Sequence, residues 1–167
     1  LLSPPDQSYG ADVTPAFTWG SVTARTLAAS AGVMLYHWEL SFDSTFGSIR
    51  DSLTTSSQTY QLPANRALST CSTVVFWRVS ATDPAGNESL PSAAARHELF
   101  AYGDMNGDCV IDAVDLSLLI DFVFFAGATM PPPDRGEMNC TLGVDATDLA
   151  YMIDLVYFGG PAACNPN

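Results

Sequence analysis

The sequence predicts a mainly β protein with a small α domain, in which residues 1–101 form a β-sandwich and residues 102–167 form a helical module. Two observations favour this division. Short stretches of alternating apolar and polar residues fill the first hundred positions and are separated by clusters of Gly, Pro, Asn, Asp and Ser. Beyond them, an acidic segment followed by an apolar helical pattern occurs twice.

Six alternating segments and one edge strand account for the predicted sandwich. Their inner faces are aromatic, because Phe17 and Trp19 alternate with polar neighbours, as do Tyr36 and Trp38. Spacings of about 8–12 residues between such segments are typical of a sandwich. The expected strands are an edge strand before Pro15, followed by residues 16–22, 33–42, 47–53, 57–62, 73–82 and 95–100.

Four sequence motifs characterise the first hundred residues. They are residues 2–6 (LSPPD), 15–19 (PAFTW), 38–41 (WELS) and 76–89 (FWRVSATDPAGNES). With these motifs the segment resembles the fibronectin type III-like domains of bacterial secreted proteins. The resemblance implies a two-sheet sandwich that serves as a spacer or a binding module. Val75 stands where such domains usually have a tyrosine.

The histidines and the motif content predict a protein that is not an enzyme. His37 and His97 are the only histidines, and each falls in an expected strand. We expect both to face solvent and neither to act as a catalytic base. No nucleophile elbow, phosphate-binding loop or dinucleotide fingerprint occurs in the chain.

The charge of the chain is concentrated in its last third. Of 167 residues, 18 are acidic and 6 are basic, which gives a formal net charge of −12. Residues 101–167 hold ten of the acids and a single cation, Arg135. This composition excludes the basic patch that nucleic acid or an anionic membrane requires, and no apolar run is long enough to insert into a membrane. Because apolar residues separate these acids, cation sites are favoured over a solvated acidic tail.

A repeat of 33 residues organises the helical module. Residues 103–127 align with residues 136–160 without a gap, and 12 of the 25 positions are identical. Each copy begins with a twelve-residue loop that carries oxygen side chains at positions 1, 3, 5, 9 and 12, with a backbone carbonyl at position 7. This spacing encloses a hard cation such as Ca²⁺. A helix N-cap explains one or two such acids but not five spaced oxygens.

The repeat therefore predicts two calcium sites, of which the second is weaker because its loop has three carboxylates where the first has four. In the first loop we expect Asp115 to chelate the ion through both oxygens. Position 6, where a positive φ favours glycine, is Cys109 in the first loop and Leu142 in the second. The expected ligands are Asp104, Asn106, Asp108, Val110, Asp112 and Asp115 at the first site, and Glu137, Asn139, Thr141, Gly143, Asp145 and Asp148 at the second.

An Asp-Leu pair follows each loop, at residues 115–116 and 148–149, and the second copy ends in Gly-Gly-Pro at residues 159–161. With the paired loops, residues 102–161 resemble the dockerin family. The resemblance implies a helical domain that folds on calcium and docks onto another extracellular protein, usually a cohesin. It also implies that loop positions 10 and 11 and the following helix face select the partner. The expected partner contacts are Ala113, Val114, Leu118, Phe122, Phe125, Ala146, Thr147 and Tyr151.

Both expected helices are apolar on nearly every face. In the first, Leu116, Leu119 and Phe124 belong to one apolar face, and further apolar residues occupy the others. Such helices are expected to be buried nearly all round. Packing on the sandwich and packing in a protein interface both satisfy this expectation.

The four cysteines predict two disulfides. Their even number is typical of a secreted chain, and the absence of a Cys-x-x-Cys spacing argues against zinc. We favour Cys140–Cys164, which leaves Cys71–Cys109. In a fibronectin type III topology, Cys71 would face the next module, so this bond would staple the two modules together. Free buried cysteines remain the alternative.

The sequence as a whole predicts a non-catalytic, extracellular, calcium-stabilised structural or assembly protein of a bacterial cell surface. Its dockerin-like module is expected to contact a protein partner, with a homo-polymer of neighbouring copies in a filament or layer as one form. Two alternatives stay open: a dockerin-bearing fragment that anchors a secreted enzyme to a cohesin on a scaffold, and a glycan-binding adhesion module. Leu1 is expected to be a processed or trimmed N-terminus.

Overall fold

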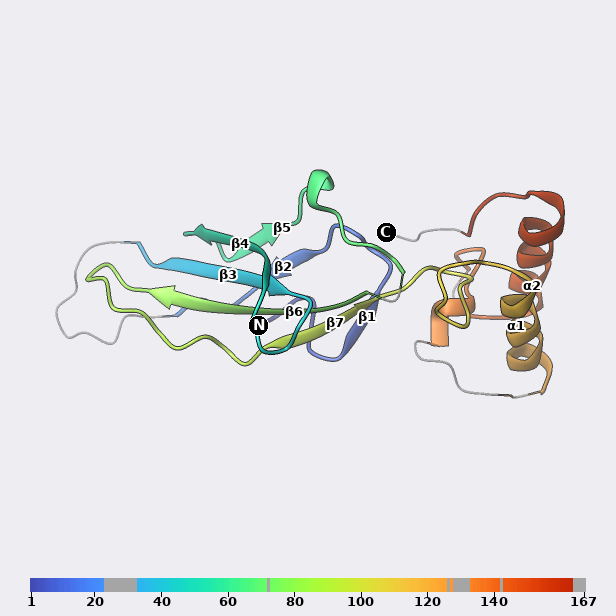
Figure 1. Ribbon diagram of the computed structural model, residues 1–167, viewed down its shortest axis with the longest axis horizontal. Coiled ribbons are helices and arrows are strands. Elements are labelled where there is room, and N and C mark those ends of the chain that lie inside the picture. The colour runs from blue at the N-terminus through green and yellow to red at the C-terminus, as the bar shows by residue number, and fades with distance from the viewer. Residues whose placement is uncertain (23–32, 72, 126, 128–132, 142, 164–167) are drawn as a thin grey trace. The chain divides into compact units, whose positions relative to one another are not determined.

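The computed structural model describes residues 1–22, 33–71, 73–125, 127, 133–141 and 143–163. The protein is mainly β and carries two short helices, as the sequence predicts (Figure 1). Its Cα positions form two compact units. The first comprises Leu1–Ser8, Val13–Leu68 and Thr73–Glu98, and the second comprises Tyr9–Asp12, Ser69–Ser72 and Leu99–Asn167.

Two sheets contain the strands of the structure. The larger has five strands in the order β1-β7-β6-β3-β4, and the smaller pairs β2 with β5 in antiparallel fashion. Each segment with strand periodicity contains a strand, although β2 ends at Thr18 because Gly20, which weakens a strand, follows closely. The strands are β1 Ser8–Gly10, β2 Ala16–Thr18, β3 Leu35–Ser41, β4 Ile49–Thr55, β5 Thr59–Gln61, β6 Thr73–Thr82 and β7 Ala95–Leu99.

Aromatic side chains from both sheets form the core of the first unit. The ring of Phe17 lies 4.8 Å from that of Trp38 and 5.3 Å from that of Trp77, and Tyr60 lies 4.8 Å from Trp38. Phe17 and Tyr60 come from the smaller sheet, whereas both tryptophans come from the larger one. The alternation in the sequence therefore predicts the inner faces correctly.

The prediction that both histidines face solvent is wrong for His97. This residue is 5% exposed, because Ala95, His97 and Leu99 all point to the inner face of β7. Its Nδ1 lies 2.8 Å from the hydroxyl of Ser8 on the edge strand β1. The side chain of His37 is 43% exposed, and its Nε2 lies 3.5 Å from Glu39 Oε1.

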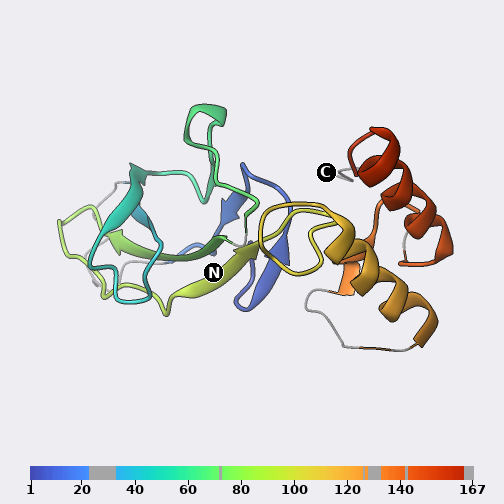
Figure 2. The ribbon, with the colours of Figure 1, turned by 45° about the vertical axis from the view of Figure 1, so that its right-hand side comes forward.

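Two helices lie side by side in the second unit (Figure 2). They are α1, Ala113–Phe125, and α2, Ala146–Ile153, which continues as one π-helical turn over Asp154–Phe158. Short 3₁₀ turns occupy Ala64–Arg66 and Pro133–Gly136. No helix in the described part of the chain has the length and apolar character needed to cross a bilayer. The core between the helices and their loops consists of Met105, Leu116, Leu119, Met138 and Met152.

Candidate metal centre

A buried carboxylate closes the first acidic loop onto the helix that follows it. Asp115 lies in the first turn of α1 and is fully buried. Its Oδ1 accepts hydrogen bonds from the backbone N–H groups of Met105 at 2.7 Å and Asn106 at 3.1 Å, and its Oδ2 accepts one from Asp112 at 2.9 Å. One side chain therefore fixes the start of the loop, its end and the first turn of the helix.

The second loop repeats this arrangement bond for bond. Asp148 is fully buried in the first turn of α2. Its Oδ1 accepts from the backbone N–H groups of Met138 at 2.7 Å and Asn139 at 3.2 Å, and its Oδ2 accepts from Asp145 at 2.8 Å. The 33-residue repeat of the sequence is thus also a repeat of local geometry.

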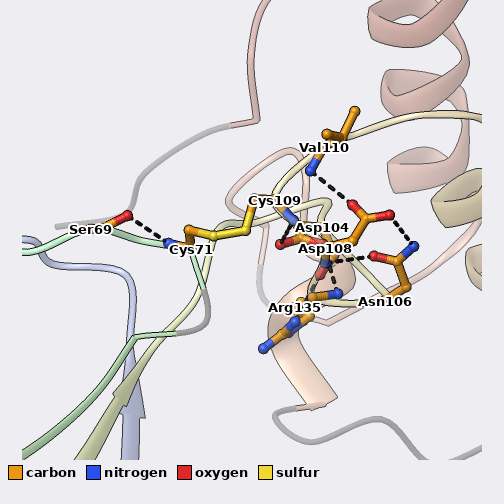
Figure 3. The surroundings of a disulfide bond; sticks show 9 residues. Ser69, Cys71, Asp104, Asn106, Asp108, Cys109, Val110 and Arg135 are labelled. Carbon is orange, nitrogen blue, oxygen red and sulfur yellow. Dashed lines mark hydrogen bonds between the residues drawn. A yellow bond between two sulfur atoms is a disulfide. The ribbon is translucent and has the colours of Figure 1, made fainter. Parts of the chain in front are cut away.

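Position 1 of the first loop is also a buried carboxylate. Asp104 is 1% exposed, and its Oδ1 accepts from the backbone N–H of Gly107 at 2.7 Å. Its Oδ2 accepts from the backbone N–H of Cys109 at 3.2 Å. The loop is therefore folded around its first side chain, as Figure 3 shows together with the neighbouring disulfide.

Glu137 takes the same role in the second loop with a longer side chain. Its Oε1 accepts from the backbone N–H groups of Asn139 and Thr141, both at 3.2 Å, and its Oε2 accepts from Gly143 at 2.8 Å. The extra methylene reaches loop position 7, one residue beyond the position that Asp104 reaches. Burial raises the pKa of Glu137, but these three backbone donors outweigh burial, so its pKa is lowered.

The remaining side chains of the candidate ligand set in the first loop are more exposed, and they form hydrogen bonds with one another and with the backbone. Asn106 Nδ2 donates to Asp108 Oδ2 at 2.8 Å, and the backbone N–H of Val110 donates to Asp108 Oδ1 at 2.9 Å (Figure 3). Asp112 Oδ1 accepts from the backbone N–H of Val114 at 2.7 Å. Asp112 and Asp108 therefore stabilise turns in the loop.

In the second loop, the hydroxyl groups of two threonines take part in the hydrogen bonds. Asn139 Nδ2 donates to the hydroxyl of Thr147 at 2.7 Å. Asp145 is the N-cap of α2, and the hydroxyl and backbone N–H of Thr147 lower its pKa. The position-5 residue Thr141 donates through its hydroxyl to Asn139 Oδ1 at 2.5 Å.

The chemistry of these side chains suits a hard cation, because every candidate ligand is an oxygen. Among the described residues, no three His, Cys, Asp or Glu side chains already converge as a metal cluster. The expectation that Asp115 chelates the ion through both oxygens stays a prediction. In the structure, its Oδ1 accepts two backbone N–H groups and its Oδ2 accepts one.

Cysteines occupy left-handed backbone positions in both loops. Cys71 and Cys109 form the disulfide that the sequence analysis favours (Figure 3). Both belong to the second compact unit, so the bond lies within that unit, whereas the sequence-based division assigns Cys71 to the sandwich. Cys109 has φ +78°, as predicted for position 6, and Cys140 has φ +62°. Cys140 is also disulfide-bonded, but its expected partner Cys164 lies outside the described residues, as does Leu142.

Arg135 has a structural role that the sequence analysis does not predict. It is buried, and its Nη1 donates to the backbone carbonyl of Asp104 at 3.0 Å. The backbone N–H of Gly103 donates in return to the carbonyl of Arg135 at 2.7 Å. The guanidinium carbon also lies 5.6 Å from the centre of the Phe100 ring. The sequence feature that could have indicated this role is that Arg135 is the single cation among the ten acids of residues 101–167.

The two loops also contact each other through equivalent methionines and glycines. A Cβ added at Gly103 would lie 2.8 Å from Met138 Sδ, and one added at Gly136 would lie 3.3 Å from Met105 Cε. Each methionine is position 2 of its own loop, and each glycine directly precedes a loop. The methionine of each copy therefore covers the glycine of the other copy.

Comparison with known proteins assigns no family to this chain. No protein-family model matches it, and no curated protein matches it. A solved structure that it resembles is α-L-rhamnosidase from Dictyoglumus thermophilum, with a TM-score of 0.41 and 19% sequence identity. The match covers 66% of this chain but only 12% of that enzyme. A likeness this weak assigns neither a fold nor an activity.

Most of the expected partner contacts lie at the surface of the second unit. Ala113, Val114, Phe125, Ala146, Thr147 and Tyr151 are exposed, whereas Leu118 and Phe122 are half-buried, and Leu118 packs against the core. Phe124 is more than half exposed, although its helical spacing places it on the face of buried Leu116 and Leu119. The core of this unit is small, and it does not extend to the last turn of α1.

Proposed function

We propose that this protein is a non-catalytic, calcium-stabilised extracellular assembly protein whose dockerin-like module contacts neighbouring copies in a surface filament or layer. The observation that supports this most is a pair of aromatic residues exposed at the end of each helix. Phe125 is 72% exposed, and its repeat equivalent Phe158 is 77% exposed. Phe124 and its equivalent Tyr157 are also mostly exposed.

Four large aromatic side chains at equivalent positions favour a protein-binding surface. Aromatic residues are enriched at protein interfaces, and burying large exposed rings in an interface is favourable. Charged residues make up only 14% of the chain, where about 25% is usual. Association would remove these rings from water at little cost in desolvated charge.

Calcium gives the acidic loops their proposed role in this assembly. Asp104, Asn106, Asp108, Asp112 and Asp115, with the carbonyl of Val110, would hold the first ion, and the equivalent residues of the second loop would hold the other. Bound Ca²⁺ supplies positive charge that offsets the crowded carboxylates. Two ions would change the formal net charge of the chain from −12 to about −8.

Light scattering after size exclusion, with calcium and with chelator, tests the proposal. We expect wild-type protein in calcium to form concentration-dependent oligomers. The double variant Phe125→Ser/Phe158→Ser should stay monomeric, because both positions contribute to the association surface. Leu2→Ser is the matched control, because Leu2 is exposed in the sandwich. A wild-type protein that stays monomeric at high concentration in saturating calcium contradicts self-assembly.

One observation favours the second candidate, anchoring to a cohesin on a scaffold. Three arginines of the sandwich already pair with carboxylates of the same unit: Arg66 with Asp51, Arg78 with Glu39 at 2.6 Å, and Arg96 with Glu98 at 2.5 Å. A second copy would therefore offer few unpaired cations to an acidic module. Binding to a panel of immobilised cohesins, together with a monomeric state in calcium, would support anchoring over self-assembly.

A further inference from the structure

The Cys71–Cys109 disulfide ties the first acidic loop to the segment that precedes β6 (Figure 3). The two cysteines are 38 positions apart in the sequence and belong to the same compact unit. Cys109 is position 6 of the loop and stands between Asp108 and Val110, two of the candidate calcium ligands. The disulfide therefore ends inside the proposed calcium site, and breaking it changes what holds that site in shape.

The cross-link holds its cysteine in a backbone conformation that is unfavourable for any residue with a Cβ. Cys109 has φ +78°, in the left-handed region that favours glycine. In this conformation its backbone N–H donates to Asp104 Oδ2 at 3.2 Å, while the N–H of Gly107 donates to Asp104 Oδ1 at 2.7 Å. Asp104 is the buried carboxylate at position 1. The disulfide therefore supports the contact between the first and sixth positions of the loop.

Both cysteines of this disulfide are exposed residues, whereas the carboxylates of Asp104 and Asp115 are buried. A disulfide opens when a thiolate attacks one of its sulfur atoms, so the reaction depends on access, and exposed disulfides are the more labile ones. A dithiol that reduces the bond transfers two electrons and two protons to it. Cys71 and Cys109 then become thiols, and the dithiol becomes a disulfide.

We propose that Cys71–Cys109 is a redox-sensitive switch, whose reduction by a dithiol releases position 6 of the first loop and lowers the affinity of that loop for Ca²⁺. Without the cross-link, the left-handed conformation of Cys109 is populated less, and its N–H bond to Asp104 forms less often. Binding of the ion then has to order the loop, which costs affinity. The calcium half of this inference rests on the proposed function, whereas the release of the loop needs no ion.

Thermodynamic linkage gives this switch a reciprocal property. If the disulfide raises the calcium affinity of the first loop by some factor, bound calcium stabilises the disulfide against reduction by the same factor. We expect a factor of about ten, which is within the usual range for two coupled sites. In saturating calcium, half-reduction should therefore require a ratio of reduced to oxidised dithiothreitol that is about tenfold higher than in chelator.

Dithiothreitol as the reductant and Ca²⁺ as the probe test the switch in a variant that isolates this bond. Cys140→Ser/Cys164→Ser retains two of the four cysteines, so Cys71–Cys109 is the one disulfide that it can form. In calcium-free buffer, we expect reduction to speed hydrogen exchange at the Cys109 backbone amide about fivefold. Wild-type protein treated in the same way should show the same change.

Calcium titrations against a competing chelator measure the affinity of each loop of this variant. The backbone amides of Gly107 and Gly143 report on the first and second loops, because each donates to the carboxylate at position 1 of its own loop. Reduction should weaken calcium binding at the first loop about tenfold and leave the second loop nearly unchanged. Cys71→Ser/Cys109→Gly should bind calcium more tightly than Cys71→Ser/Cys109→Ser, because glycine adopts φ +78° readily.

Two results would overturn the proposal: a Cys109 amide that exchanges equally fast in the oxidised and reduced forms, and a first loop that binds calcium equally tightly in both. A failure of the oxidised and reduced forms alike to bind calcium would contradict the proposed function and the calcium half of the inference. The amide exchange in calcium-free buffer would still decide whether the disulfide controls the loop.

Discussion

Asp43 organises the whole turn between β3 and β4. Its Oδ1 accepts from the backbone N–H groups of Thr45 at 2.9 Å and Gly47 at 3.2 Å, and its Oδ2 accepts from the Ser41 hydroxyl at 3.0 Å. The Thr45 hydroxyl, followed by the Gly47 backbone N–H, lowers the pKa of Asp43 well below its usual range. The charged carboxylate is therefore part of the folded turn.

This lowered pKa makes stability depend on pH in a defined direction. Asp43 stabilises the fold above its unfolded pKa of about 3.9, and that stabilisation is lost as pH falls below this value. We expect the free energy of unfolding to fall less steeply between about pH 5 and 2 in Asp43→Asn than in the wild type. Urea denaturation at several pH values across this range measures the free energy of unfolding of each protein. The exposed Glu88→Gln variant is the control, and an identical slope for all three proteins would contradict the prediction.

The close packing around Gly136 leaves no room for a larger side chain. A Cβ added there would lie 2.9 Å from both Leu119 Cδ1 and Val144 Cγ1. We expect Gly136→Ala to lower the free energy of unfolding of the second unit by about 1–3 kcal/mol through overpacking. Gly20→Ala is the control, because an added Cβ meets nothing within 4 Å there, and it should change stability by less than about 0.5 kcal/mol.

At the scale of elements, the first acidic loop is held by a disulfide in addition to its hydrogen bonds. The Cys71–Cys109 bond joins residues 38 positions apart and ends inside the loop. We expect Cys71→Ser/Cys109→Ser to lose about 2–4 kcal/mol, because the unfolded chain gains freedom. Cys71→Ser/Cys109→Gly should be about 1 kcal/mol more stable than the serine pair, since glycine tolerates φ +78°. Denaturation of both variants checks the order, and the reverse order would mean that the backbone at this position relaxes.

The second loop offers a gain-of-function prediction. Thr141 occupies position 5, where the first loop has the carboxylate of Asp108. Thr141→Asp should strengthen calcium binding at the second site about tenfold, and Asp108→Asn should weaken the first site by a similar factor, because ligand charge sets affinity. Titration calorimetry measures both changes. If neither substitution alters calcium affinity, these loops are not the calcium ligands.

The elements differ in how well the sequence predicts them. The bounds of β6 match the predicted residues 73–82, because the apolar stripe of Val75, Trp77, Val79 and Ala81 is a local signal. The repeat likewise predicts that Asp115 and Asp148 occupy equivalent places. The burial of Arg135 and His97 was not predicted, because their partners come from segments distant in the sequence. Phe124 is exposed because the small core of the second unit ends before the last turn of α1. The spacing of apolar residues along a helix does not show where the core ends.

At the scale of the whole molecule, the two units have separate cores, and calcium should act on one of them. All three tryptophans lie in the first unit, and both helices lie in the second. We expect chelation to lower the thermal midpoint followed by circular dichroism at 222 nm by about 10 °C or more, and to leave the tryptophan fluorescence midpoint nearly unchanged. A shift of both midpoints together would show that the two units unfold as one.

The reciprocal packing of Met105 and Met138 makes the duplicated module indivisible. Each methionine covers the glycine that precedes the other copy's loop. A chain cut between the copies would leave each half with an uncovered glycine and a thioether in water. Each half would also lack the Arg135 link between the copies. We therefore expect the two copies to fold as one unit and neither copy to fold stably by itself.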